Sequence, residues 1–267
     1  PGAFGVFVTR TGTQGQLPAL LNGDIFSWSP ENLTGPSSGA EQLMDQYLRQ
    51  KAEGAAAVAT GNDKVLRELF STSMNRAQTL KELQSQLSWT SSGDFSEQIQ
   101  FATSLLKLGV SRVVTLQANN SWDSHSNNDA TQSTSWESLF SSLLELKAAL
   151  AAEPGVDGGL TLADETVIVV LSEMGRTPRL NGNLGKDHWP YTAAMVSGPG
   201  LQGGRVYGGY DIYYYGRKVD FASGEVDDNY GTNLACDSFG ATLLRIAGLD
   251  SEEFLAGVGH VEAAVAS

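Results

Sequence analysis

Residues 165–190, "ETVIVVLSEMGRTPRLNGNLGKDHWP", join the most apolar run of the chain to a segment rich in charged side chains. The apolar run is continuous rather than alternating, which is typical of a parallel strand covered on both faces. Glu173, Arg176, Asp187 and His188 follow it. In an open parallel sheet, ligands bind beyond the carboxyl ends of the strands, because the loops converge there. We therefore predict a binding site at the end of this strand.

A second apolar segment, further upstream, has the same organisation. Residues 110–117, "VSRVVTLQ", are rich in β-branched residues, and they run directly into the polar loop "ANNSWDSHSNND". A helix is predicted next, because Thr134 and Glu137 have the spacing of a capping box and leucines then recur on one face. Strand, polar loop, helix and strand predict a βαβ crossover. The expected fold class is therefore α/β, with a mainly parallel sheet sandwiched by helices.

The remaining segments extend this fold in both directions. We expect an opening strand, a loop over 24–40, helices within 41–87, a capped helix from Asp94 to Gly109, a strand over 191–198, a surface hairpin within 207–218 and a helix over 237–250. The tyrosines of the hairpin are either packed side chains or a platform for a ligand. The chain is predicted to form a single α/β domain, in which 1–104 supply the leading strand and a helical layer and 105–267 carry the site.

The composition excludes several classes of protein. With 267 residues, 41% of them hydrophobic, the chain can bury a substantial core. Its net charge of −13 repels phosphate backbones and no basic run offsets it, so nucleic acid is not an expected partner. Cys236 is the single cysteine, which excludes an intrachain disulfide and a zinc site built on cysteines. No apolar run approaches the roughly 20 residues of a membrane span.

The polar side chains after the two predicted strands are suited to binding a metal ion. Asp123 and His125 follow the first strand, and Glu173, Asp187 and His188 follow the second. Carboxylate and imidazole together suit zinc, manganese or iron, whereas a mostly oxygen set favours magnesium or calcium. Each residue also has a purely structural interpretation. Asp123 could cap a turn, His125 could be a surface or hydrogen-bonded loop residue, and Glu173 could be the ion-pair partner of Arg176. Asp187 and His188 could cap the strand that follows them.

The segments "WDSHSNN", "VIVVLSEMGRTPRLNGNLGKDHWP", "SGPGLQGGRVYGGYD" and "DSFGATLLRIAGLD", in this order, resemble the bacterial family called domain of unknown function 1501. The element "GRTPR" followed by "DHW" is the most specific, and "WDSH" is the next. Members of that family look like the alkaline phosphatase and sulfatase superfamily. In that superfamily, acids and histidines at the carboxyl edge of an α/β sheet bind one or two metal ions that hydrolyse phosphate or sulfate esters.

The resemblance implies a role for each site residue. The implied metal ligands are Asp123, His125, Glu173, Asp187 and His188, with Glu173 at a second ion. Arg176 would clamp the anionic ester, because a guanidinium matches a tetrahedral oxyanion through two parallel hydrogen bonds, or it would instead hydrogen-bond to a metal ligand and hold it in place. Trp122 and Trp189 would wall the site and limit the access of water.

The function implied by this resemblance is a metal-dependent hydrolase of phosphate or sulfate esters that acts on a small anionic substrate. Zinc is the expected cofactor, with magnesium, manganese or calcium as alternatives. The family also implies export to the periplasm or cell surface through a twin-arginine leader, and an early segment with a further ligand and the nucleophile. Neither the leader nor this early segment is found before Pro1, so we expect the chain to be the carboxyl-terminal part of a longer protein. The alternative is a non-catalytic exported protein that keeps the alkaline-phosphatase-like fold and binds a surface partner or joins an assembly.

Overall fold

The computed structural model describes residues 7–10, 17–20, 38–83, 94–109, 111–118 and 120–266. Contacts within the chain divide it into two compact units. The first comprises Pro1–Asn119 and Ser142–Ala149, and the second comprises Asn120–Ser141 and Leu150–Ser267. All of the predicted site residues belong to the second unit.

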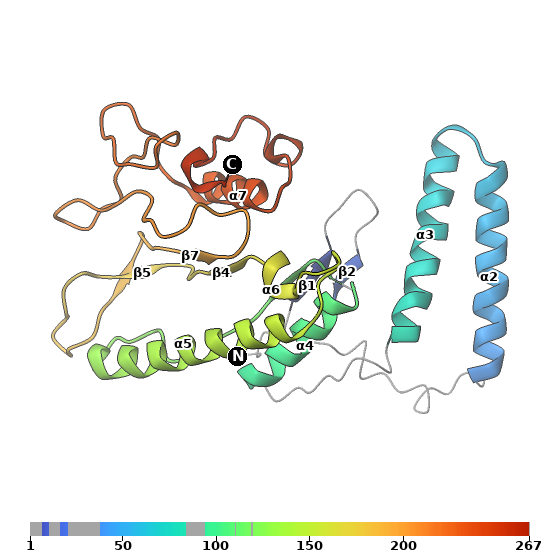
Figure 1. The fold of residues 1–267 in the computed structure, drawn as a ribbon, viewed down its shortest axis with the longest axis horizontal. Helices are drawn as coiled ribbons and strands as arrows, with labels where there is room; N and C mark the ends of the chain where they lie inside the picture. Colours follow the sequence, from blue (N-terminus) through green and yellow to red (C-terminus); the bar gives the residue numbers. More distant parts are fainter. Residues whose placement is uncertain are drawn as a thin grey trace. The chain divides into compact units, whose positions relative to one another are not determined.

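Two long helices, α2 (Ser38–Val58) and α3 (Gly61–Leu83), lie side by side in the first unit (Figure 1). Gly61 has a φ of +59°, a conformation that favours glycine because it strains residues with a Cβ. The helices predicted within 41–87, with interruptions expected near Gly54 and Gly61, are confirmed as far as Leu83. The interruption at Gly61 is present, but Gly54 lies inside α2 and does not interrupt it. Of the loop predicted over 24–40, residues 24–37 lie outside the described residues. No helix in the described part of the chain is long and apolar enough to cross a membrane.

Helix α4 (Phe95–Lys107) confirms the capped helix expected from the sequence. The Asp94 carboxylate accepts a hydrogen bond at 2.7 Å from the backbone amide two residues ahead, which satisfies a donor that the helix leaves free. Gly109 follows the helix with a φ of +64°, as expected for a helix end. Ile99 and Leu105 lie on the buried face of α4.

The strands of the first unit form a sheet of order β2–β1–β3, made of β1 (Phe7–Arg10), β2 (Leu17–Leu20) and β3 (Val113–Thr115). Both pairings are antiparallel, and Val8 lies opposite Val114 in the β1–β3 ladder. The predicted strand within 110–117 is confirmed, but only its centre forms ladder bonds.

Helix α5 (Asn128–Ala152) begins earlier than predicted, so the capping box expected at Thr134 and Glu137 is wrong. The Thr134 hydroxyl instead donates to the carbonyl oxygen of Ala130 at 3.1 Å, inside the helix. At the first residue of α5, the backbone N–H of Asn128 donates to the carbonyl oxygen of Leu184 at 2.8 Å. The predicted leucine face is confirmed by the burial of Leu139, Leu146 and Leu150.

The second unit contains two short antiparallel ladders. β4 (Ile168–Val170) pairs with β7 (Met195–Ser197), and β5 (Gly175–Arg176) pairs with β6 (His188–Trp189). The strands predicted within 165–172 and 191–198 are thus confirmed, and they pair with each other. The short helix α6 (Leu162–Glu165) directly precedes β4.

The last part of the chain packs around helix α7 (Cys236–Ile246), which is followed by two 3-10 helices, η3 (Ser251–Glu253) and η4 (Glu262–Ala264). Gly248, with a φ of +72°, ends the helix predicted within 237–250. The predicted surface hairpin also forms, with Tyr210 bridged to Gly216.

Every strand pairing among the described residues is antiparallel. The predicted α/β fold makes 110–117 and 165–172 parallel strands of one sheet, whereas the described ladders join β3 to β1 and β4 to β7. The described ladders do not include the predicted parallel, alkaline-phosphatase-like sheet, which stays a prediction. The single domain over 1–267 also stays a prediction.

Candidate metal site

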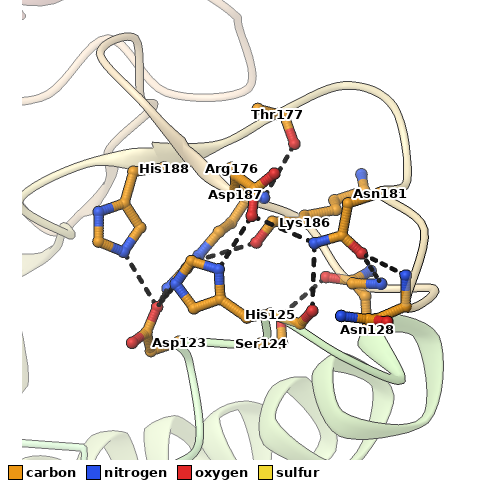
Figure 2. A network of polar contacts seen from close by, with 12 residues as sticks. Asp123, Ser124, His125, Asn128, Arg176, Thr177, Asn181, Lys186, Asp187 and His188 are labelled. Carbon is orange, nitrogen blue, oxygen red and sulfur yellow. Dashed lines mark hydrogen bonds and ion pairs between the residues drawn. The ribbon is translucent and has the colours of Figure 1, made fainter.

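The site is formed by the β5–β6 hairpin and by the segment that leads into helix α5 (Figure 2). The register of the hairpin places Arg176 opposite His188, so their side chains leave the same face of the ladder. Gly175 is required beside them, because a Cβ there would collide with the carbonyl oxygen of Tyr191. The hairpin thus brings a guanidinium and an imidazole together.

Backbone hydrogen bonds hold the hairpin loop against the start of α5. The Lys186 amide donates to the carbonyl oxygen of Ser124 at 2.9 Å, and the Asn128 amide donates to that of Leu184 at 2.8 Å. Gly185 is buried at this contact, and a Cβ there would collide with the backbone of the opposing segment. Two segments far apart in the sequence are therefore in fixed register at the site.

Asn181 closes the hairpin loop and also reaches the site (Figure 2). Its Oδ1 accepts hydrogen bonds from the backbone amides of Asn183 and Gly185, both at 2.9 Å. Its Nδ2 donates to the carbonyl oxygen of His125 and to Asp187 Oδ1, both at 3.1 Å. Sequence reasoning missed this residue, because the Asn-Gly pair at 181–182 predicts a turn but not a long-range contact.

Three side chains meet at one carboxylate oxygen of Asp123 (Figure 2). Asp123 Oδ1 lies 3.0 Å from His125 Nε2 and 3.1 Å from His188 Nε2. Arg176 Nη2 donates a hydrogen bond to the same oxygen. Within the described ranges, Asp123, His125 and His188 are the one group of three candidate ligands whose donor atoms all lie within 4.8 Å of one another.

The imidazole of His125 lies between two carboxylates. Its Nε2 faces Asp123, while its Nδ1 lies 3.0 Å from Asp187 Oδ1. A neutral imidazole carries a single N–H, so it can donate to only one of these carboxylates. A metal ion held at Nε2 would satisfy both sides, because Nδ1 could then donate to Asp187 as in carboxylate–histidine–metal arrangements. Asp187 is thus placed to orient the His125 ring, and it lies outside the group of three candidate ligands.

Hydrogen bonds to both carboxylates favour their ionised forms. The Arg176 guanidinium, followed by His188, holds the pKa of Asp123 at about 2, below its ordinary value of 3.8. Hydrogen bonds from His125 and then from Asn181 lower the pKa of Asp187. Both groups are therefore ionised at neutral pH, which is the state that metal binding requires.

The site is open to solvent. The side chains of Asp123, His125 and His188 are 66%, 49% and 53% exposed, whereas that of Arg176 is 19% exposed. Catalytic zinc sites have three protein ligands and leave the fourth position to water or substrate. The group has the number of ligands and the access that such a site needs.

The structure does not bring Glu173 into this group. Its carboxylate accepts a hydrogen bond from the Ser172 hydroxyl at 3.1 Å. Arg176 pairs with Asp123 instead of Glu173, so the alternative structural ion pair is not formed either. The described residues therefore form one group of candidate ligands, and Glu173, expected at a second ion, is not part of it.

The two tryptophans lie in the two segments that form the site. Trp122 contacts Trp136 edge to face, with ring centroids 5.2 Å apart. Trp189 lies in β6 beside His188, and its Nε1 donates to the carbonyl oxygen of Tyr214 at 3.0 Å. Trp189 and Arg176 also line a common cavity. The role of Trp122 and Trp189 as walls of the site stays a prediction.

Fold and site together define a protein of mixed helices and short antiparallel sheets with an exposed Asp-His-His group. The chain belongs to the family described as protein of unknown function (DUF1501), which matches residues 37–265. This confirms the family part of the predicted resemblance, while the likeness to alkaline phosphatases and sulfatases stays a prediction. No curated protein and no solved structure gave a match.

Proposed function

We propose that Asp123, His125 and His188 bind one divalent metal ion, zinc in preference, and that the chain carries the metal site of a phosphate or sulfate ester hydrolase. The observation that supports this best is the convergence of two imidazole Nε2 atoms on one carboxylate oxygen, at 3.0 and 3.1 Å. The reaction would convert a small anionic ester and water into an alcohol and inorganic phosphate or sulfate.

The donor set favours zinc over the hard cations. Ligand atoms at 2.0–2.1 Å from a tetrahedral zinc ion are about 3.3 Å from one another, close to the two distances from Asp123 Oδ1. Magnesium and calcium prefer oxygen ligands, and two of the three ligands here are nitrogens. With Glu173 outside the group, the proposal is limited to one ion.

The chain's own residues would position the ester. Arg176 is held by Asp123 and by the carbonyl oxygen of Lys186, 3.2 Å from Nη1, so its guanidinium stays beside the group and can bind an ester oxygen. Asp187 keeps the His125 ring oriented. A bound zinc ion would supply Lewis-acid polarisation of the ester oxygen or an activated water.

Metal content tests the first part of the proposal. We expect the purified chain to retain close to one zinc per molecule in elemental analysis and to rebind zinc in calorimetry after treatment with a chelator. His188→Ala should abolish tight binding, because it removes one of three ligands. His260→Ala is the matched control, since the third histidine of the chain lies outside the group. Equal zinc affinity of the two variants would contradict the metal site.

Ester hydrolysis tests the second part. Phenyl phosphate and phenyl sulfate should be hydrolysed by the zinc-loaded chain and not by the chelated chain. The Asp123→Ala/His188→Ala double variant should lose this activity while keeping its circular dichroism spectrum. Full activity in the double variant would exclude the proposed site.

The second candidate function is a non-catalytic exported protein that binds a surface partner or joins an assembly. It is favoured by the exposure of large apolar side chains along α2 and α3, including Leu43, Leu66 and Phe70, at 68%, 67% and 58%. Stoichiometric zinc without turnover of either ester would support this function. Export itself is proposed from the family resemblance, and fractionation of the producing cells would test it.

A further inference from the structure

A cavity of about 330 Å³ opens next to the candidate metal site. Residues of the β5–β6 hairpin and of the segment after it line this cavity, among them Arg176, Lys186, Trp189, Tyr191, Tyr210 and Tyr214. Arg176 also contacts Asp123, so the cavity and the metal site share a residue.

The aromatic side chains of the cavity are held in place by their neighbours. Trp189 donates to the carbonyl oxygen of Tyr214 at 3.0 Å, and its ring lies 6.4 Å from that of Tyr191. Tyr191 packs over Gly216, where a Cβ would lie 2.8 Å from the ring. Tyr191 and Tyr214 are nevertheless 38% and 55% exposed. Ring surfaces are thus available in positions fixed before a ligand binds, which limits the entropy lost on binding.

The polar groups of the cavity favour an anion. The backbone of Lys186 is tied to Ser124 and Arg176, while its ammonium forms no ion pair with any described residue. Partial burial raises the pKa of the Tyr210 hydroxyl above its ordinary 10.0, so this group stays protonated and can donate. Among the described residues that line the cavity, none carries a carboxylate, so no lining side chain repels an anionic ligand.

We propose that this cavity binds an aromatic anion, an aryl phosphate or aryl sulfate, with its ring against Trp189, Tyr191 and Tyr214 and its anionic group toward Lys186 and Arg176. Stacked and edge-to-face contacts would hold the ring, and charge-assisted hydrogen bonds would hold the anion. The proposal names the substrate class of the proposed hydrolase and rests on that function for turnover, but binding to the cavity needs no metal ion.

The first test compares ligands on the unaltered chain in the presence of a chelator. Phenyl phosphate should bind at least about tenfold more tightly than methyl phosphate in calorimetry, because only the phenyl ester can occupy the aromatic wall. In saturation-transfer difference NMR, the ring protons of phenyl phosphate should show a signal transferred from the protein. Equal affinity for phenyl and methyl phosphate, or for phenyl phosphate and glucose 6-phosphate, would overturn the proposal.

The second test changes the cavity. Trp189→Ala should weaken phenyl phosphate binding by about tenfold or more, because it removes the ring contact and the hydrogen bond to the carbonyl oxygen of Tyr214. Methyl phosphate binding should change far less, since no cationic group of the cavity is lost. Lys186→Gln, which keeps the backbone bonds of that residue, should weaken both ligands. Tyr230→Ala is the matched control, because Tyr230 is 92% exposed and does not line the cavity. Phenyl phosphate binding that is unchanged in both cavity variants would also overturn the proposal.

These measurements separate the cavity from the proposed hydrolase. Loss of zinc binding in His188→Ala concerns the metal site alone, and the chelator removes any contribution of zinc to ligand affinity. Phenyl phosphate binding without zinc binding would support the cavity and contradict the hydrolase. Zinc binding without preference for the phenyl ester would support the metal site and contradict the proposed ligand of the cavity.

Discussion

His125 Nδ1 lies 3.0 Å from Asp187 Oδ1, although the two residues are 62 positions apart in the sequence. One ring nitrogen of His125 is thus engaged by a carboxylate, and the other is directed at Asp123. Partners of this kind raise the basicity of a ligating imidazole and fix its orientation. Asp187 is therefore the residue through which the affinity of the proposed site can be changed without removing a ligand.

The Asp187→Asn variant should bind zinc roughly 10–100-fold more weakly than the unaltered chain, because an amide lacks the charge that supports the imidazole. Calorimetric titration of both proteins would measure the ratio. Asp129→Asn is a suitable control, since Asp129 is exposed in the first turn of α5 and outside the ligand group. An unchanged affinity in Asp187→Asn would show that the contact does not support a ligand.

Gly185→Ala should lower the free energy of unfolding by about 1–3 kcal/mol, because the new methyl group has no space against the backbone at His125. It should weaken zinc binding as well, since His125 must move. Gly182→Ala, in the same loop, has open space around the added methyl group and should be close to neutral. Denaturant unfolding of the two variants would measure the difference, and equal stabilities would contradict the packing of the hairpin.

Asn181→Ala should destabilise the chain by roughly 1–3 kcal/mol, because the amides and the carboxylate that Asn181 bonds lose their partner. The loss should also speed hydrogen exchange in the loop between β5 and β6. Asn183→Ala is the control, as the described contacts of Asn183 are made by its backbone. Similar exchange rates in the two variants would mean that Asn181 does not hold the loop.

Asp228 should titrate below the ordinary value of 3.8, because hydrogen bonds from Arg217 lower its pKa. Since the folded pKa is lowered, the pair stabilises the fold above pH 3.8, and this contribution is lost as the pH falls through the folded pKa. NMR titration of the carboxyl carbon would show the midpoint. Arg217→Gln should raise it toward 3.8, whereas Arg205→Gln, which removes another surface pair, should not.

Features fixed by neighbouring residues were predictable from the sequence. The start of α4 follows from Asp94, which caps the helix through an amide two residues away. The start of α5 was not predictable in this way, because the partner of the Asn128 amide is Leu184, from a distant loop. Local capping patterns carry no information about such a contact.

The same limit applies to the site. Two polar segments after apolar strands correctly indicated that Asp123, His125 and His188 meet. Glu173 was expected with them because it lies in the same segment, yet it precedes the hairpin that carries Arg176 and His188. That hairpin depends on the close approach of Gly175 to Tyr191, which no periodicity in the sequence reveals.

The hairpin between β5 and β6 also has a consequence for protease resistance. Its loop is held to the start of α5 by a few backbone bonds, and the proposed ion would add a crosslink between Asp123 and His188, which are 65 positions apart. An ion that binds only when the loop is in contact with the start of α5 lowers the fraction of molecules in which the loop has detached. When the ion is in excess, this fraction falls in proportion to the ion concentration divided by its dissociation constant. The rate at which a protease cleaves this loop would therefore fall as the zinc concentration rises, and the zinc-free protein would be cleaved faster than the zinc-bound protein.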